Sequence, residues 1–313
     1  FAVEMFEMEA QCGGVLRYGI PEYRLPKEVV AREIRYIEKM GVVIHRNTHV
    51  GVEITVDSLF AQGFDAIFIG TGLGKPKSLE IPIWQNGKCI SEGDGATKCA
   101  DLRRIRLATH FLRRVELINE GYMKREELPV DEGARVFVIG CGNTAMDASR
   151  TALRIGASAV DVIYNKGIDT MSALRAEYDD AVKEGVQFNW WSSIEEIHVD
   201  DNLDITAIVL ETREPDKEPV RKVLPADNII MAIGATPNTK IVRSTSGLEN
   251  DDRKFLITRD LPYGMTTRKG VFAGGDVANR QATVVHAMQD AKQVARGITQ
   301  YVDAVRLMKM INM

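Results

Sequence analysis

Residues 136–150, VFVIGCGNTAMDASR, run from an apolar strand through two glycines into a helical pattern. Gly140, Gly142 and Ala145 fit the G-x-G-x-x-A spacing of a dinucleotide-binding turn. The first glycine permits a tight turn, the second lets the backbone approach a pyrophosphate, and the alanine lets helix and strand pack closely. A purely structural turn is the alternative. The strand before it, the helix after it and the second strand that follows favour a dinucleotide, whose phosphates the helix N-terminus would bind.

The end of that second strand indicates which nucleotide is bound. An acidic residue there binds the ribose 2′-hydroxyl of NAD, whereas a basic residue accommodates the 2′-phosphate of NADP. The chain has Asn165 and Lys166 at this place, with Arg175 further on, and no acid. NADP is therefore slightly preferred over NAD. The alternative is that Lys166 is an ordinary solvated lysine.

A second glycine turn lies in residues 270–288, GVFAGGDVANRQATVVHAM. Gly274 and Gly275 let the end of a strand approach a ligand closely, and Asp276 could accept a hydrogen bond from a sugar-like hydroxyl. A helix expected to begin near Ala282 would direct its positive end toward electron-rich ligand atoms. The alternative is that Asp276 is only a helix N-cap and that the glycines form ordinary turns.

Strands alternate with helical patterns along most of the chain, which predicts a doubly wound α/β fold. Continuous apolar runs such as DAIFIG, residues 65–70, are typical of buried parallel strands. The order of the patterns predicts two Rossmann-like units, the second inserted into the first. Helices are expected over 27–40, 100–118, 143–155 and 172–184, with a long helix at the C-terminal end.

Composition excludes several classes of function. The 313 residues are 45% hydrophobic and carry a net charge of −4, which gives no basic footprint for nucleic acid, and no apolar run reaches membrane-spanning length. The four cysteines form no C-x-x-C pair, so reduced thiols and a cytoplasmic location are expected. The missing pair also argues against disulfide-reductase chemistry, which needs a redox dithiol beside the flavin.

Four stretches together resemble the glutamate synthase small-subunit family: 13–27, GGVLRYGIPEYRLPK; 142–157, GNTAMDASRTALRIGA; 232–238, AIGATPN; and 270–277, GVFAGGDV. Relatives of that family include the large subunit of the ferredoxin:NADP transhydrogenase and the flavin half of dihydropyrimidine dehydrogenase. The resemblance implies an FAD-binding domain over 1–128 and 248–313. It implies an inserted NAD(P)-binding domain over 129–247, with hydride passing between the two cofactors.

The resemblance also implies which residues bind each cofactor. For FAD they are Glu7 (at the adenosine ribose), Gly14, Val15, Arg24 (near the flavin), Val50, Thr71, Gly72, Gly275, Asp276, Ala282, Thr283 and Val284. For NAD(P) they are Gly140, Gly142, Asn143, Thr144, Ala145, Asn165, Lys166, Ala232, Ile233 and Gly234. No catalytic side chain and no metal ligand are predicted, because hydride transfer between cofactors asks the protein mainly for orientation.

The resemblance places the first FAD strand and its glycine loop before Glu7, so both are expected to lie upstream of Phe1. It also implies an electron-accepting partner subunit or Fe–S protein. The four cysteines lack cluster-ligand spacing, so any Fe–S centre is expected outside this chain. Two alternatives are a non-catalytic nucleotide-binding subunit that has lost flavin, and a flavin or ferredoxin reductase of the same fold.

Overall fold

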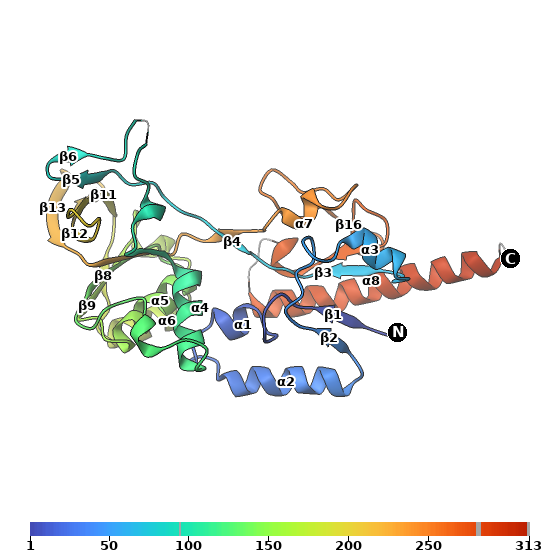
Figure 1. Cartoon of the computed structure of the whole chain (residues 1–313). Coiled ribbons are helices and arrows are strands. Elements are labelled where there is room, and N and C mark those ends of the chain that lie inside the picture. The colour runs from blue at the N-terminus through green and yellow to red at the C-terminus, as the bar shows by residue number, and fades with distance from the viewer. Residues whose placement is uncertain (94, 280–282, 312–313) are drawn as a thin grey trace. The chain divides into compact units, whose positions relative to one another are not determined.

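The computed structural model describes residues 1–93, 95–279 and 283–311. The chain forms two compact units, each made of separate segments (Figure 1). Unit 1 comprises Phe1–Cys12, Ile37–Pro76 and Ala235–Met313, and unit 2 comprises Gly13–Tyr36 and Lys77–Gly234. Unit 2 is thus inserted into unit 1 in two pieces. The units are defined by contacts alone, so the division of the chain into FAD and NAD(P) domains stays a prediction.

A five-stranded parallel sheet forms the centre of unit 2. Its order is β10-β9-β8-β14-β7, and every neighbouring pair is parallel. The strands are β7 (Ile105–Leu107), β8 (Arg135–Ile139), β9 (Ala159–Ile163), β10 (Gln187–Asn189) and β14 (Asn228–Met231). Most apolar residues of the central strands β9, β8 and β14 are buried, as expected of a parallel sheet covered on both faces, whereas those of the edge strands β7 and β10 are half-buried.

Helices cover one face of this sheet and a second sheet covers the other. The helices are α4 (Ala108–Asn119), α5 (Asn143–Arg154) and α6 (Arg175–Lys183). The second sheet has the order β13-β12-β11-β5-β6, with β5 (Ile83–Gln85), β6 (Lys88–Cys89), β11 (Ser192–Val199), β12 (Ile205–Thr212) and β13 (Val220–Pro225). Along β8, Val136 and Val138 pack in the helical core, whereas Phe137 packs against the second sheet. This is the two-residue period of a strand.

The N-terminal part of unit 2 carries helix α1 (Val15–Tyr18), and helix α2 (Lys27–Lys39) begins there. Lys27 is buried, and its ammonium donates to the carbonyls of Leu16 (3.3 Å) and Ile20 and lies 3.8 Å from Glu116 of α4. Burial lowers the pKa of Lys27 and raises that of Glu116. The loop between α1 and α2 is therefore fastened to the body of unit 2.

Unit 1 contains a parallel pair, β1 (Glu4–Phe6) and β2 (Val43–His45), and a four-stranded sheet of order β16-β17-β18-β3. The strands of the larger sheet are β3 (Ile67–Ile69), β16 (Thr258–Asp260), β17 (Tyr263–Thr266) and β18 (Val271–Ala273). The helices are α3 (Val56–Ala61), α7 (Lys240–Arg243) and α8 (Val284–Ile311). Short strands β4 (Lys75–Pro76) and β15 (Ala235–Thr236) pair antiparallel.

Strand β18 divides the core of unit 1 into two parts. Val271 and Ala273 pack with Val56 of α3 and Ile241 of α7, whereas Phe272 packs with Val294 of α8. Strands β3 and β18 are parallel neighbours, so their carboxyl ends leave the sheet at the same edge.

The α/β class predicted from the sequence is confirmed, but two helix starts are wrong. The helix predicted over 100–118 begins at Ala108, because residues 105–107 form β7 at the edge of the central sheet. The helix predicted over 172–184 begins at Arg175, because the N–H groups of Ser172 and Ala173 donate to the carbonyl of Cys141 (3.2 and 3.1 Å).

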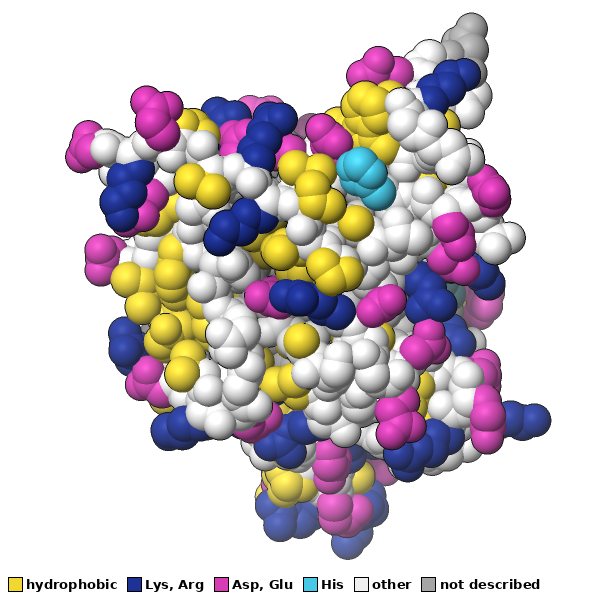
Figure 2. All heavy atoms as spheres, turned by 90° about the vertical axis from the view of Figure 1, so that its left-hand side faces the viewer, with side chains coloured by type: hydrophobic (Ala, Val, Ile, Leu, Met, Phe, Trp, Pro, Cys, Tyr) yellow, Lys and Arg dark blue, Asp and Glu magenta, His cyan; other side chains and the backbone are white. Residues whose placement is uncertain are grey.

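Charges of both signs are interspersed over the surface seen from the side of β9 and β13 (Figure 2), in keeping with the small net charge of −4. Among residues 1–93, 95–279 and 283–311, we find no helix with the length and apolar character needed to cross a membrane.

Candidate functional site

The central sheet of unit 2 has a topological switch point between β8 and β14. From β8 the chain adds β9 and then β10 on one side, whereas β14 joins on the other side. In open α/β sheets, ligands bind outside the carboxyl ends of the strands at such a point. Gly140 follows β8 and Ala232 follows β14, so the structure brings together two segments that the sequence placed at the NAD(P) site.

Gly140 lies at a position that only glycine can occupy. Its φ is +120°, and a β-carbon there would lie 2.9 Å from the carbonyl carbon of Ala232 and closer still to the carbonyl oxygen. The two segments are held by backbone hydrogen bonds, from Gly140 to Ile163 (2.9 Å) and from Ala232 to Ile139 (2.8 Å). The turn is thus a close approach of two backbones, as the G-x-G-x-x-A spacing predicted.

Helix α5 begins directly after this turn, with Gly142 as its N-cap and no side chain capping it. The N–H groups of Gly142, Asn143 and Thr144 find no acceptor in the described part of the chain. The Asn143 side chain accepts instead from the N–H of Leu174 (2.8 Å), and Ala145 is fully buried against the sheet. Unpaired N–H groups at the N-terminus of a long helix form an anion-binding site.

The remaining NAD(P) candidates lie at the surface around the switch point. Asn165 and Lys166 follow β9 and are exposed, and the Lys166 ammonium has no ion-pair partner among the described residues. Ala232 is buried, Ile233 is half-buried, and Gly234 is exposed with a φ of +90°. That these residues bind NAD(P) stays a prediction.

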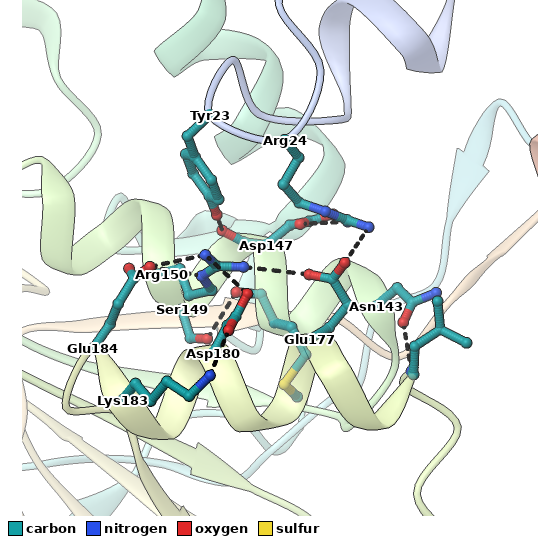
Figure 3. A network of polar contacts seen from close by, with 12 residues as sticks. Tyr23, Arg24, Asn143, Asp147, Ser149, Arg150, Glu177, Asp180, Lys183 and Glu184 are labelled. Carbon is teal, nitrogen blue, oxygen red and sulfur yellow. Dashed lines mark hydrogen bonds and ion pairs between the residues drawn. The ribbon is translucent and has the colours of Figure 1, made fainter.

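Arg24 joins the α1–α2 loop to helices α5 and α6 (Figure 3). Its guanidinium donates to both carboxylate oxygens of Asp147 on α5 (2.7 and 2.9 Å) and pairs with Glu177 on α6 (2.6 Å). Burial raises the pKa of Asp147 to about 6, although Arg24 beside it acts in the opposite direction. Arg24, assigned by resemblance to the flavin, is therefore already engaged by two carboxylates of unit 2.

The network extends along α5 and α6. Arg150 pairs with Glu177 (3.3 Å) and Glu184 (2.8 Å), and the guanidinium of Arg154 lies 4.1 Å from the ring centroid of Tyr23. Sequence reasoning missed Asp147 and this network. The available signal was a charged residue between buried apolar positions of α5, where an unpaired carboxylate would be costly.

In unit 1, two further glycine turns leave the same edge of the sheet. Thr71 and Gly72 follow β3, and Gly275 and Asp276 follow β18, with φ of +63° at Gly72 and +70° at Gly275. The N–H of Gly274 donates to the carbonyl of Ile69 (3.3 Å), which ties the two strand ends together. These candidates for FAD binding are thus neighbours, although they lie far apart in the sequence.

The Asp276 carboxylate makes no hydrogen bond or ion pair with any described residue. Burial raises its pKa above the ordinary value. The short 3₁₀ helix here, Gly275–Val277, has Gly274 as its N-cap, so the alternative in which Asp276 is only a helix cap is wrong. That Asp276 binds FAD stays a prediction.

The other FAD candidates are distributed over both units. Glu7, after β1, accepts from the N–H of Glu9 (2.9 Å), and Val50 is half-buried in unit 1. Gly14 (φ +50°) and the exposed Val15 belong to unit 2. Thr283 and Val284 are exposed at the start of α8, and Ala282 lies outside the described residues. FAD binding at these positions stays a prediction.

Two further features of the described residues lie apart from these turns. The described residues contain no group of three or more His, Cys, Asp or Glu side chains that could bind a metal ion. A hollow of about 780 Å³ lies along α8, between residues such as Met265, Tyr301 and Met308, and includes no predicted cofactor residue.

Comparison with known proteins gives relatives along nearly the whole chain. The chain is 31% identical over 312 residues to the NADP(+)-dependent formate dehydrogenase subunit beta of Moorella thermoacetica, covering 96% of this chain and 40% of that protein. It is 29% identical to the glutamate synthase [NADPH] small chain of Escherichia coli (strain K12), covering 96% of this chain and 63% of that protein. The chain therefore spans less than two thirds of these relatives.

Solved structures share the fold at lower identity. Thioredoxin reductase from T. acidophilum matches with a TM-score of 0.67 and 18% identity, over 97% of this chain and 91% of that one. Mycobacterium tuberculosis FprA in complex with NADPH matches with a TM-score of 0.70 and 18% identity, over 98% and 79%. The model of the pyridine nucleotide-disulphide oxidoreductase family matches residues 6–291. With its paired glycine turns at the ends of parallel strands, the chain belongs to the pyridine nucleotide-disulphide oxidoreductase family.

Proposed function

We propose that this chain is the cofactor-binding module of an oxidoreductase of the glutamate synthase small-subunit type. It passes hydride between NAD(P)H and FAD, and electrons then leave to an Fe–S centre or a partner subunit. One observation carries the proposal: each unit has a pair of backbone turns at the carboxyl ends of adjacent parallel strands. In unit 2 these are Gly140 and Ala232, and in unit 1 they are Gly72 and Gly275.

The residues at both turns fit the groups that the family implies. At the α5 turn, Gly140 lets two backbones approach closely, and the N–H groups of Gly142 to Thr144 are unpaired among the described residues, which suits a pyrophosphate. At the β18 turn, the Asp276 carboxylate, which has no partner among the described residues, suits a ligand hydroxyl. A dinucleotide in unit 2 and a flavin in unit 1 are therefore supported by backbone shape and by hydrogen-bonding capacity.

When bound, nicotinamide and flavin exchange a hydride by chemistry that belongs to the cofactors. The chain contributes binding and orientation. The N-terminus of α5 would hold phosphate through backbone N–H groups and its positive dipole end, and Asp276 would hold a hydroxyl in unit 1. Lys166 is an exposed cation where a 2′-phosphate would lie, which supports the slight preference for NADP.

The names of the relatives support a partner. The formate dehydrogenase chain is called a subunit beta and the glutamate synthase chain a small chain, and this chain covers only part of each. All four cysteines are free thiols, so a disulfide-reductase activity has no redox pair here. We infer that electrons leave the flavin for an Fe–S centre or a partner subunit.

The test is spectroscopic. The protein made from its full-length gene should show the visible absorption band of a flavin. Mixing this protein with NADPH or NADH under anaerobic conditions should bleach that band. A flavin band that neither nucleotide bleaches would refute the proposal. A colourless protein that still binds NADPH would favour the alternative of a non-catalytic nucleotide-binding subunit.

A further inference from the structure

A buried carboxylate lies directly behind the β18 turn, which we define as residues 274–279. Asp290 of α8 is only 7% exposed. It accepts hydrogen bonds from the N–H of Gly275 (2.6 Å), the side-chain amide of Asn279 (2.7 Å) and the hydroxyl of Tyr263 (2.9 Å). Its donors come from the start of the turn, its end and the neighbouring strand β17.

These contacts fix the shape of the turn. Gly275 has a φ of +70°, and a β-carbon on Gly274 would lie 2.8 Å from the Asp290 carboxylate. The backbone of the turn therefore packs directly against that carboxylate. The pKa of Tyr263 is raised by burial and by its hydrogen bond to Asp290, which keeps the hydroxyl a donor. A buried carboxylate is tolerated only where donors surround it, so the turn and Asp290 hold each other in place.

The two carboxylates of this region, Asp290 and Asp276, differ in their hydrogen bonding. Asp290 is satisfied by three donors, whereas Asp276, inside the turn that Asp290 anchors, has no partner among the described residues. We propose that Asp290 is a positioning residue: it holds Gly275 and Asn279 so that the Asp276 carboxylate stays free to bind the hydroxyl groups of the flavin. This inference rests on the proposed function and adds a residue that the sequence did not predict.

The first test compares Asp290→Asn with Asp303→Asn, the same substitution at an exposed position of the same helix. The NH₂ group of the asparagine would face hydrogen-bond donors that now bind the Asp290 carboxylate, so the turn would lose an acceptor. Asp290→Asn should therefore raise the Kd for FAD, measured by titrating flavin-free protein, by about ten-fold or more. Amide hydrogen exchange over the β18 turn should also become faster without flavin present. Asp303→Asn should change neither quantity.

A double-mutant cycle separates positioning from general stability. If Asp290 acts through Asp276, the effect of Asp290→Asn on FAD affinity should fall below about two-fold in an Asp276→Ala background. Equal effects in both backgrounds would overturn the proposal. Tyr263→Phe removes one hydrogen-bond donor to Asp290 and keeps the ring, so it should raise the Kd for FAD by a smaller factor. This variant replaces Asp290→Asn in the test if Asp290→Asn does not fold.

The exchange measurement keeps this inference separate from the proposed function. If the unsubstituted protein does not bind FAD, the proposed function fails, yet exchange over residues 274–279 still reports whether Asp290 anchors the turn. Unchanged exchange in both Asp290→Asn and Tyr263→Phe would refute the anchoring role, whatever the protein binds.

Discussion

Replacing Arg24 with alanine tests whether the network in Figure 3 holds the α1–α2 loop to unit 2. Arg24 is the nearest cation to Asp147, with contacts at 2.7 and 2.9 Å, and it pairs with Glu177 at 2.6 Å. Its side chain is 23% exposed, whereas that of Asp147 is 6% exposed. The substitution therefore leaves a buried carboxylate without its main counterion.

Removing one partner of a buried ion pair typically costs about 3–5 kcal/mol of unfolding free energy. Arg24 is partly exposed, and Glu177 still has an ion-pair partner in Arg150, at 3.3 Å, when Arg24 is removed. We therefore expect Arg24→Ala to cost about 3 kcal/mol at pH 8, at the lower end of that range.

The loss should depend on pH, because Asp147 titrates. Its pKa in the folded chain, about 6, lies above the ordinary value of 3.8, so the folded state binds this proton more tightly than the unfolded chain does. The contribution of Asp147 to stability therefore falls as the pH rises from near 4 to near 6. Without Arg24 its pKa rises further, so at pH 5 Asp147 is neutral and needs no counterion. The loss should then be smaller than at pH 8.

Urea unfolding followed by tryptophan fluorescence measures this directly, since all three tryptophans, Trp84, Trp190 and Trp191, belong to unit 2. Arg175→Ala is the matched control: Arg175 and Asp179 form an exposed pair at 3.0 Å, worth about 0.5 kcal/mol or less. An equal loss at pH 5 and pH 8, or a loss no larger than that of Arg175→Ala, would refute the reasoning.

Three further outcomes are expected. Gly140→Ala should weaken NADPH binding at least about ten-fold, because the β-carbon meets the carbonyl of Ala232, whereas Gly185→Ala, at a φ of +99° in open space, should lower the melting temperature only and leave the Kd unchanged. Lys166→Glu should shift the ratio of the Kd values for NADPH and NADH toward NADH, and an unchanged ratio would show that Lys166 is an ordinary solvated lysine. A thiol reagent should label only Cys89 in the folded protein, as counted by mass, because the other three thiols are buried and burial raises their pKa values.

The parts of the fold that could be predicted are those encoded by local patterns. The apolar run and glycine spacing of residues 136–145 specify a strand, a turn and a helix start, and all three lie where expected. Strand β7 could not be predicted, because its three residues become a strand only by pairing with β14, more than a hundred positions later in the chain. Short edge strands carry too little periodicity to be recognised alone.

The candidate site was predictable to the same extent. The glycines are identifiable because their spacing serves the turn itself, whereas Asp147 and Asp290 act through partners brought close only by folding. Arg24 and Asp147 are separated by 123 positions, and the bond from Tyr263 to Asp290 joins different elements. A sequence shows that such a residue is charged but not which group neutralises it.

The segmented composition of the two units has a consequence for synthesis on the ribosome. Unit 2 needs no residue beyond Gly234, so its core can close while the rest of the chain is still being made. Unit 1 needs β17, β18 and α8, which follow unit 2 in the sequence. During vectorial synthesis strand β3 must therefore wait, with its partner strand β18 absent, until the main segment of unit 2 has been made.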